Sequence, residues 1–151
     1  MTGRNINREI IEDLYTQALL LSDDVRAAFD LRLQSNAANG DDVTRVALSI
    51  EGLRTTTRLM HVLAWLLNQR AHMAGELSDK QLEHFCALPE EREADAENLA
   101  RLEAPICALI AESERLHARV ARLDRHWREK IAGDMPVASL QGRIARAFAS
   151  G

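Results

Sequence analysis

The chain has 151 residues, a length that fits one domain able to bury a core without disulfide or metal cross-links. Its net charge of -4 argues against broad affinity for nucleic acid, because binding to phosphates needs an accumulated positive field. Two cysteines without CxxC spacing, a polar N-terminus and the lack of an apolar run of roughly 20 residues predict a cytoplasmic protein without a membrane span.

The first element in chain order is a long helix, predicted over residues 7–35. Its apolar residues recur at steps of three and four, which is the spacing of one helix face. The stretch 36–42 then collects turn-forming residues, and Asp41 or Asp42 can cap the next helix. The apolar face comprises Ile11, Leu14, Ala18, Leu21, Val25 and Ala28.

The second helix is predicted over residues 43–74 and carries two apolar stripes. Together they cover about half of the circumference, which predicts a central helix packed against more than one neighbour. We call the longer one the first stripe; it comprises Val46, Ile50, Leu53, Thr57, Met60, Ala64, Leu67, Ala71 and Ala74. The second stripe comprises Leu59, Leu63, Leu66, Arg70, Met73 and Leu77.

Gly75 is placed to end the second helix through a left-handed cap. The sequence Ser78-Asp79-Lys80-Gln81 is typical of a capping box and predicts a short helix over residues 79–88. The acidic connection 89–104 follows, and the sequence leaves open whether it is helical or mobile.

A third long helix is predicted over residues 105–131, with Pro105 in its first turn. Three long helices with short links predict an all-α, up-down-up three-helix bundle over residues 1–131, with coiled-coil-like packing. The remaining residues 132–151 are expected to form a mobile or weakly docked tail with a short amphipathic run that includes Ile144 and Phe148. The apolar stripe of the third helix comprises Leu99, Leu102, Ile106, Leu109, Ser113, Leu116, Val120, Leu123 and Trp127.

The sequence offers little catalytic chemistry. A di-metal centre in a helical bundle needs paired Glu-x-x-His motifs, and the chain has one, formed by Glu114 and His117. It has no phosphate-binding glycine loop, GxSxG elbow or HExxH motif. We therefore expect a protein without enzymatic activity, cofactor or metal.

The second helix carries the main candidates for partner binding. Glu51, Arg54, Arg58 and Trp65 are predicted to project from one side, opposite the first stripe. Trp65 is then a candidate anchor for a partner or a second subunit, because tryptophan often dominates interface energetics. The alternative is that Trp65 folds against a neighbouring helix.

Two further sets of charged residues have structural and functional interpretations. Arg70 lies within the second stripe, so it must snorkel or pair with a carboxylate such as Glu76 or one from another helix; we favour a structural ion pair. Three arginines on one face of the third helix could bind an acidic protein or nucleic acid, but a solvated or covered face is the more ordinary interpretation. These are Arg115, Arg119 and Arg122.

The second helix also carries a resemblance to a known family. The run Glu51-Gly52-Leu53-Arg54-Thr55-Thr56-Thr57-Arg58-Leu59-Met60 is followed by Ala64-Trp65-Leu66-Leu67-Asn68-Gln69-Arg70-Ala71. Together they resemble the signature helix of the alphaproteobacterial RcdA family, the regulators of CtrA degradation. The resemblance spans roughly residues 10–126.

The resemblance implies a homodimeric three-helix bundle without catalytic activity, acting as an adaptor for the ClpXP protease. Such a protein would bind ClpX- and ClpP-associated proteins and, separately, protein cargo, raising the local concentration of cargo at the protease. The tail residues Ile144 and Phe148 would suit a second binding element. The main alternative is a homodimeric scaffold of cell polarity or division without a protease role, and a regulator that binds nucleic acid is the third.

Overall fold

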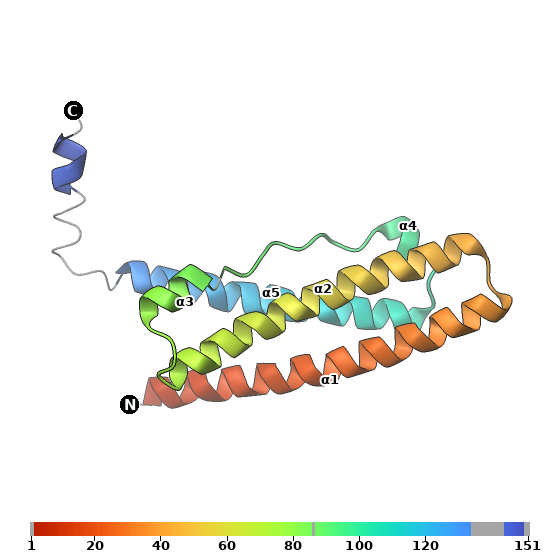
Figure 1. Ribbon diagram of the computed structural model, residues 1–151, viewed down its shortest axis with the longest axis horizontal. Coiled ribbons are helices and arrows are strands. Elements are labelled where there is room, and N and C mark those ends of the chain that lie inside the picture. The colour runs from red at the N-terminus through yellow and green to blue at the C-terminus, as the bar shows by residue number, and fades with distance from the viewer. Residues whose placement is uncertain (1, 86, 134–143, 150–151) are drawn as a thin grey trace. The chain divides into compact units, whose positions relative to one another are not determined.

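The computed structural model describes residues 2–85, 87–133 and 144–149 (Figure 1). All regular secondary structure in these ranges is helical, which confirms the predicted all-α class. The chain divides into two compact units, Met1–Val120 and Ala121–Gly151. The helices are α1 (Thr2–Asn39), α2 (Asp42–Met73), α3 (Asp79–Phe85), α4 (Ala96–Leu99) and α5 (Ala104–Gly133), and residues 144–149 are also helical.

Helix α1 is longer at both ends than the predicted range of 7–35, and it packs against α2. At its C-terminal end the amide of Gly40 donates to the carbonyl of Asn36 at 2.7 Å, so the helical hydrogen bonding continues through residues expected to form a turn. The predicted apolar face is buried, except that Phe29 takes the place of Ala28. The buried residues are Ile11, Leu14, Ala18, Leu21, Val25 and Phe29.

Both ends of α2 follow the sequence signals. The Asp41 side chain caps the N-terminus by accepting a hydrogen bond from the Thr44 amide at 2.6 Å. At the other end Gly75 has a φ of 80°, and the amides of Gly75 and Glu76 donate to the carbonyls of His72 and Ala71. This is the Schellman arrangement, which requires the left-handed conformation that glycine adopts without strain.

Within the described residues, the large apolar members of the first stripe of α2 are not covered by a neighbouring helix of the same chain. Val46, Leu53 and Met60 are 54%, 70% and 63% exposed. The inner face of α2 is instead a mixed set of polar and apolar residues, which we call the buried stripe. It comprises Ala47, Leu48, Glu51, Thr55, Arg58, Leu59, Val62, Trp65, Leu66 and Gln69.

Gly52 permits a close approach between α1 and α2. A Cβ atom built at this position would lie 3.0 Å from Cδ1 of Phe29, which is tighter than ordinary van der Waals contact. The aromatic ring is 5% exposed, so it packs against the α2 backbone where a larger residue would hold it away. Gly52 therefore contributes to packing at the cost of some helix propensity.

An extended segment connects α3 to α4. Helix α3 opens with the predicted capping box, in which the Gln81 amide donates to Ser78 Oγ and the Ser78 amide donates to Gln81 Oε1. Residues 87–95 have no helical structure, and we call residues 88–95 the strap. The predicted short helix ran to residue 88 and the predicted connection covered 89–104; Cys86 lies outside the described residues. The acidic connection thus consists of the strap, α4 and a turn.

Within the first unit, α5 buries one face and is linked to both long helices. Arg58 of α2 donates to Ser113 Oγ at 2.9 Å, and Arg32 of α1 pairs at 2.5 Å with Glu103, immediately before α5. The buried residues of this face are Ile106, Ile110, Ser113, Leu116 and Val120.

In the second unit, Arg128 pairs with Asp124 at 3.2 Å. The helical residues 144–149 fall within the predicted tail 132–151, of which residues 134–143 and 150–151 lie outside the described part. Across the described residues, no helix is long and apolar enough to cross a membrane.

Removing the Asp41 cap should destabilise the protein in a pH-dependent way. The hydrogen bonds from the Thr44 amide and then from its side chain lower the pKa of Asp41 from 3.8, so the charged carboxylate contributes stability above the unfolded pKa. Asp41→Ala should therefore lower the midpoint of thermal unfolding by a few degrees at neutral pH. The difference from the unmodified chain should shrink as the pH falls through the folded pKa, and an equal difference at all pH values would contradict this account.

Candidate functional site

The interior face of α2 contains charged residues that are almost fully buried. Glu51 and Thr55 are 0% exposed, Arg58 is 1% exposed and Gln69 is 4% exposed. Buried charges and amides are costly unless they are hydrogen-bonded, so their partners decide what this face can do.

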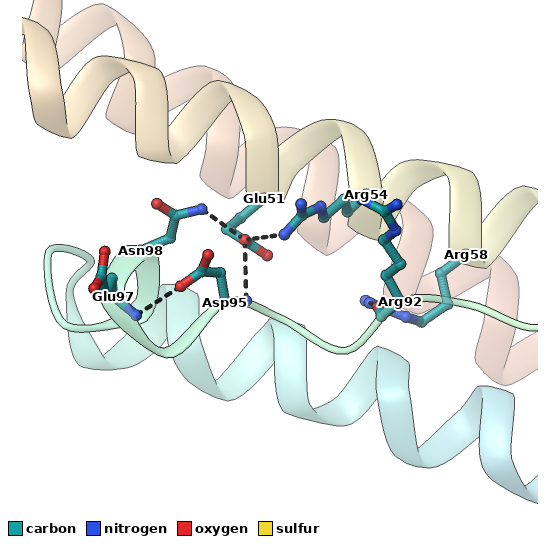
Figure 2. Close-up of polar contacts among 7 residues, drawn as sticks. All are labelled: Glu51, Arg54, Arg58, Arg92, Asp95, Glu97 and Asn98. Atoms are coloured by element: carbon teal, nitrogen blue, oxygen red, sulfur yellow. Dashed lines mark hydrogen bonds and ion pairs between the residues drawn. The ribbon is translucent and has the colours of Figure 1, made fainter.

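Glu51 is held by groups from α2, the strap and α4 (Figure 2). Its Oε1 atom accepts from Arg54 Nη1 at 3.1 Å, from the Asp95 amide at 3.3 Å and from Asn98 Nδ2 at 3.0 Å. Asp95 in turn caps α4 by accepting from the Glu97 amide at 2.8 Å. One carboxylate oxygen therefore fixes the end of the strap and the start of α4 against α2.

Arg58 joins three segments through two neutral oxygen atoms. Its Nη1 donates to Ser113 Oγ of α5, and its Nη2 donates to the carbonyl of Arg92 in the strap, each at 2.9 Å. The hydroxyl of Ser113 in turn donates a hydrogen bond to the Ile110 carbonyl at 2.6 Å. Among the described residues no carboxylate lies within ion-pair distance of Arg58, so its charge is solvated by dipoles.

Two histidines complete the attachment of the strap. His61 Nδ1 of α2 pairs with Glu91 Oε1, and His117 Nε2 of α5 donates to the Pro89 carbonyl at 3.0 Å. The strap is therefore attached to both helices, chiefly by polar contacts. Its residues Leu88, Glu91 and Ala94 are half-buried, and its other side chains are exposed.

The structure corrects the predicted placement of the α2 candidates. Glu51, Arg58 and Trp65 were expected to project outward, but they lie inside, with Trp65 only 3% exposed. Arg54 is half-buried with its guanidinium on Glu51. Periodicity of apolar residues could not detect this face, because its charged members are compensated by the strap and α5, which lie far away in sequence.

Arg70 forms an ion pair with another helix. Its Nε donates to Glu12 Oε1 of α1 at 2.8 Å, and its guanidinium carbon lies 4.4 Å from the centre of the Tyr15 ring. Its partner is thus Glu12 and not the proposed Glu76, whose backbone amide takes part in the cap that ends α2. Arg70 ties α2 to α1 by charge and by a cation–π contact.

The remaining predicted partner-binding residues are exposed. Arg115 and Arg119 lie on the outer side of α5 in the first unit. In the second unit Arg122 is exposed, and Ile144 and Phe148 are 53% and 82% exposed. Their roles in binding stay predictions.

The first stripe, identified from the sequence, forms an exposed apolar surface on α2. Its large apolar members are exposed, and beside them a groove of about 440 Å³ runs between α1 and α2. Val25 and Phe29 of α1 line this groove together with Leu53 and Met60 of α2. The unbroken spacing of three and four over the stripe was visible in the sequence and is typical of a coiled-coil interface.

Two further observations concern metal binding and the relation of the chain to known proteins. The described residues contain no group of three or more His, Cys, Asp or Glu side chains arranged to hold a metal ion. No curated protein and no solved structure matches the chain. A family model described as a protein of unknown function, DUF1465, matches residues 2–148. The chain therefore belongs to the DUF1465 family.

Proposed function

We propose that this chain is a non-enzymatic, homodimeric adaptor that binds other proteins, similar to the RcdA-family adaptors that deliver cell-cycle regulators to the ClpXP protease. Its long helices would form an up-down-up three-helix bundle, and two copies would pack through α2. The single observation that carries the proposal is the exposed first stripe. The match to DUF1465 over most of the chain is compatible with the RcdA resemblance.

The first stripe has the length and spacing of a helix–helix interface. Its large apolar members run from Val46 to Leu67, a distance of about 32 Å at the helical rise of 1.5 Å per residue. A soluble monomer rarely leaves a continuous apolar surface of this kind uncovered. An α-helical partner would place side chains between those of the stripe, as the two strands of a coiled coil do.

A second copy of the chain suits this stripe by charge. On one border of the stripe, Ser49, Thr56 and Leu63 carry no charge, and on the other border the charge of Arg54 is paired with Glu51. Asp42 and Arg70 continue the first border at its two ends with opposite signs, and within one chain they pair with Arg45 and Glu12. An antiparallel arrangement would bring Asp42 of each copy toward Arg70 of the other, and twofold pairing of this kind is the commonest symmetry among soluble oligomers.

The alternative is a structural scaffold of cell polarity or division that uses the same dimer without a protease role. The exposed stripe supports both, because it concerns assembly and not cargo. The tail distinguishes them: in the adaptor, Ile144 and Phe148 would form a second binding element for cargo.

The dimer should dissociate when charge is placed in the stripe. Leu53→Glu should weaken self-association by about 30-fold or more, because a hot-spot residue contributes at least about 2 kcal/mol. Analytical ultracentrifugation would show a shift from two chains to one, while circular dichroism stays helical. The matched control is Leu31→Glu, since Leu31 of α1 is 62% exposed but lies outside the stripe and the groove. Equal behaviour of the two variants would refute dimerisation through the stripe.

The adaptor role predicts specific partners. A tagged chain expressed in its native cells should recover ClpX or its accessory proteins, and deletion should lengthen the half-life of cargo. The role would be refuted if the tagged chain recovered no ClpX-associated protein and deletion left every cargo half-life unchanged.

Truncation after Lys130 should separate the adaptor from the scaffold. In the adaptor it should abolish cargo delivery in a reconstituted degradation assay and leave the dimer intact. Unchanged delivery would remove the tail from the mechanism.

A further inference from the structure

The strap is held mainly through its main chain. Arg58 binds the carbonyl of Arg92, Glu51 accepts from the amide of Asp95, and His117 donates to the carbonyl of Pro89. Every peptide except one with proline at the donor position offers such groups, so the sequence of the strap enters through the Glu91 carboxylate, which pairs with His61. We call the four side chains that hold the strap the strap-binding face: Glu51, Arg58 and His61 of α2, and His117 of α5.

The strap does not satisfy all the polar groups beneath it. Glu51 Oε2 and Thr55 Oγ1 are buried and lack a hydrogen-bond partner among the described residues. Leaving a buried polar atom unsatisfied costs free energy that a better-matched segment would recover. The buried Arg58 charge likewise meets neutral oxygens, although the strap carries four acidic residues. The strap is therefore an imperfect ligand for this face.

The chemistry of the face specifies the segment that would fit it. Main-chain donors and acceptors in sequence require an extended backbone, because a helical segment satisfies those groups internally. A carboxylate side chain is accommodated beside His61, where Glu91 lies, and the uncompensated Arg58 favours further negative charge. The strap itself is acidic at Glu90, Glu91, Glu93 and Asp95.

We propose that the strap-binding face is a binding site for an extended acidic peptide segment of a partner protein, and that the strap occupies this site in cis as a replaceable mimic. A partner segment would displace the strap and take over its bonds to Arg58, Glu51 and His117. Glu51 and Arg58 of this site belong to the buried stripe, and none of its four residues belongs to the first stripe, so the proposal stands independently of the dimer and of the adaptor role.

The direct test is to supply the strap in trans. Residues 88–95 are replaced with a Gly-Ser linker of equal length that ends in proline, which has no amide hydrogen for Glu51 and fits the φ of -74° at position 95. A labelled synthetic peptide of residues 87–96 is titrated into this variant and into the unmodified chain. The variant should bind the peptide, and the unmodified chain should bind it at least about tenfold more weakly, because its own strap competes. A peptide of the same composition in scrambled order serves as the control for charge alone.

Two peptides, each N-methylated at one position, test whether the face recognises the main chain. N-methylation of the peptide at Asp95 removes the donor to Glu51 and should weaken binding by about tenfold or more, the value of a hydrogen bond to a charged group. N-methylation at Glu93, whose amide takes part in none of the strap contacts described above, should have a much smaller effect. Equal losses from the two modifications would overturn recognition through the Asp95 amide.

A measurement on the unmodified chain covers the case in which the linker variant does not fold. Excess peptide should speed hydrogen exchange at the Asp95 amide as the strap is displaced, while the amides of α2 stay protected. Unchanged exchange at the Asp95 amide with the peptide in large excess would overturn the proposal, and so would the absence of binding to a linker variant that circular dichroism shows to be helical. Binding of the scrambled peptide with the same affinity would overturn it as well.

Discussion

The solvation of Arg58 is the constraint on which the first unit depends. This side chain cannot lose its charge, yet it is 1% exposed, so two oxygen atoms from other segments must replace water around it. One belongs to Ser113 of α5 and the other to Arg92 of the strap. Glu51 acts in the same way at the α4 end of the strap (Figure 2). The rotation of α2, the position of the strap and the contact with α5 therefore follow from directional bonds and not from apolar packing alone.

How far the sequence predicted this structure depends on the element. In α1 the apolar residues that recur at steps of three and four, from Ile11 to Val25, form one buried face. The caps at Asp41, Gly75 and Ser78 were predictable because each depends on residues within a few positions along the chain. In α2 two apolar stripes compete, and a pattern that scores apolar residues selects the first stripe. The polar members of the buried stripe are compensated by groups supplied by residues 92–113, which no local pattern contains.

The candidate site was predictable in its residues but not in its role. Glu51, Arg54, Arg58 and Trp65 were identified as a group, and the structure does bring Glu51, Arg54 and Arg58 together on α2 with the strap. Their inward direction could not be read from spacing, because an exposed charged face and a compensated buried face have the same periodicity. The strap was similarly hidden, since an acidic segment without apolar spacing gives no sign of the carbonyls and amides that attach it.

The orientation of α2 bears on why the first stripe should be covered. Turning α2 about its axis by about half a turn would bury Leu53 and Met60, each worth about 1.5–3 kcal/mol, but it would expose the buried Leu59, Val62, Trp65 and Leu66. The hydrogen bonds lost in that rotation would be replaced by bonds to water at a small net cost. Both terms disfavour the rotated state, so the observed orientation leaves the first stripe exposed in a single chain, and a partner packed along α2 would cover it. This argument from the free energy of α2 is independent of the RcdA resemblance, and it leads to the same proposal that the chain works with a partner packed along this helix.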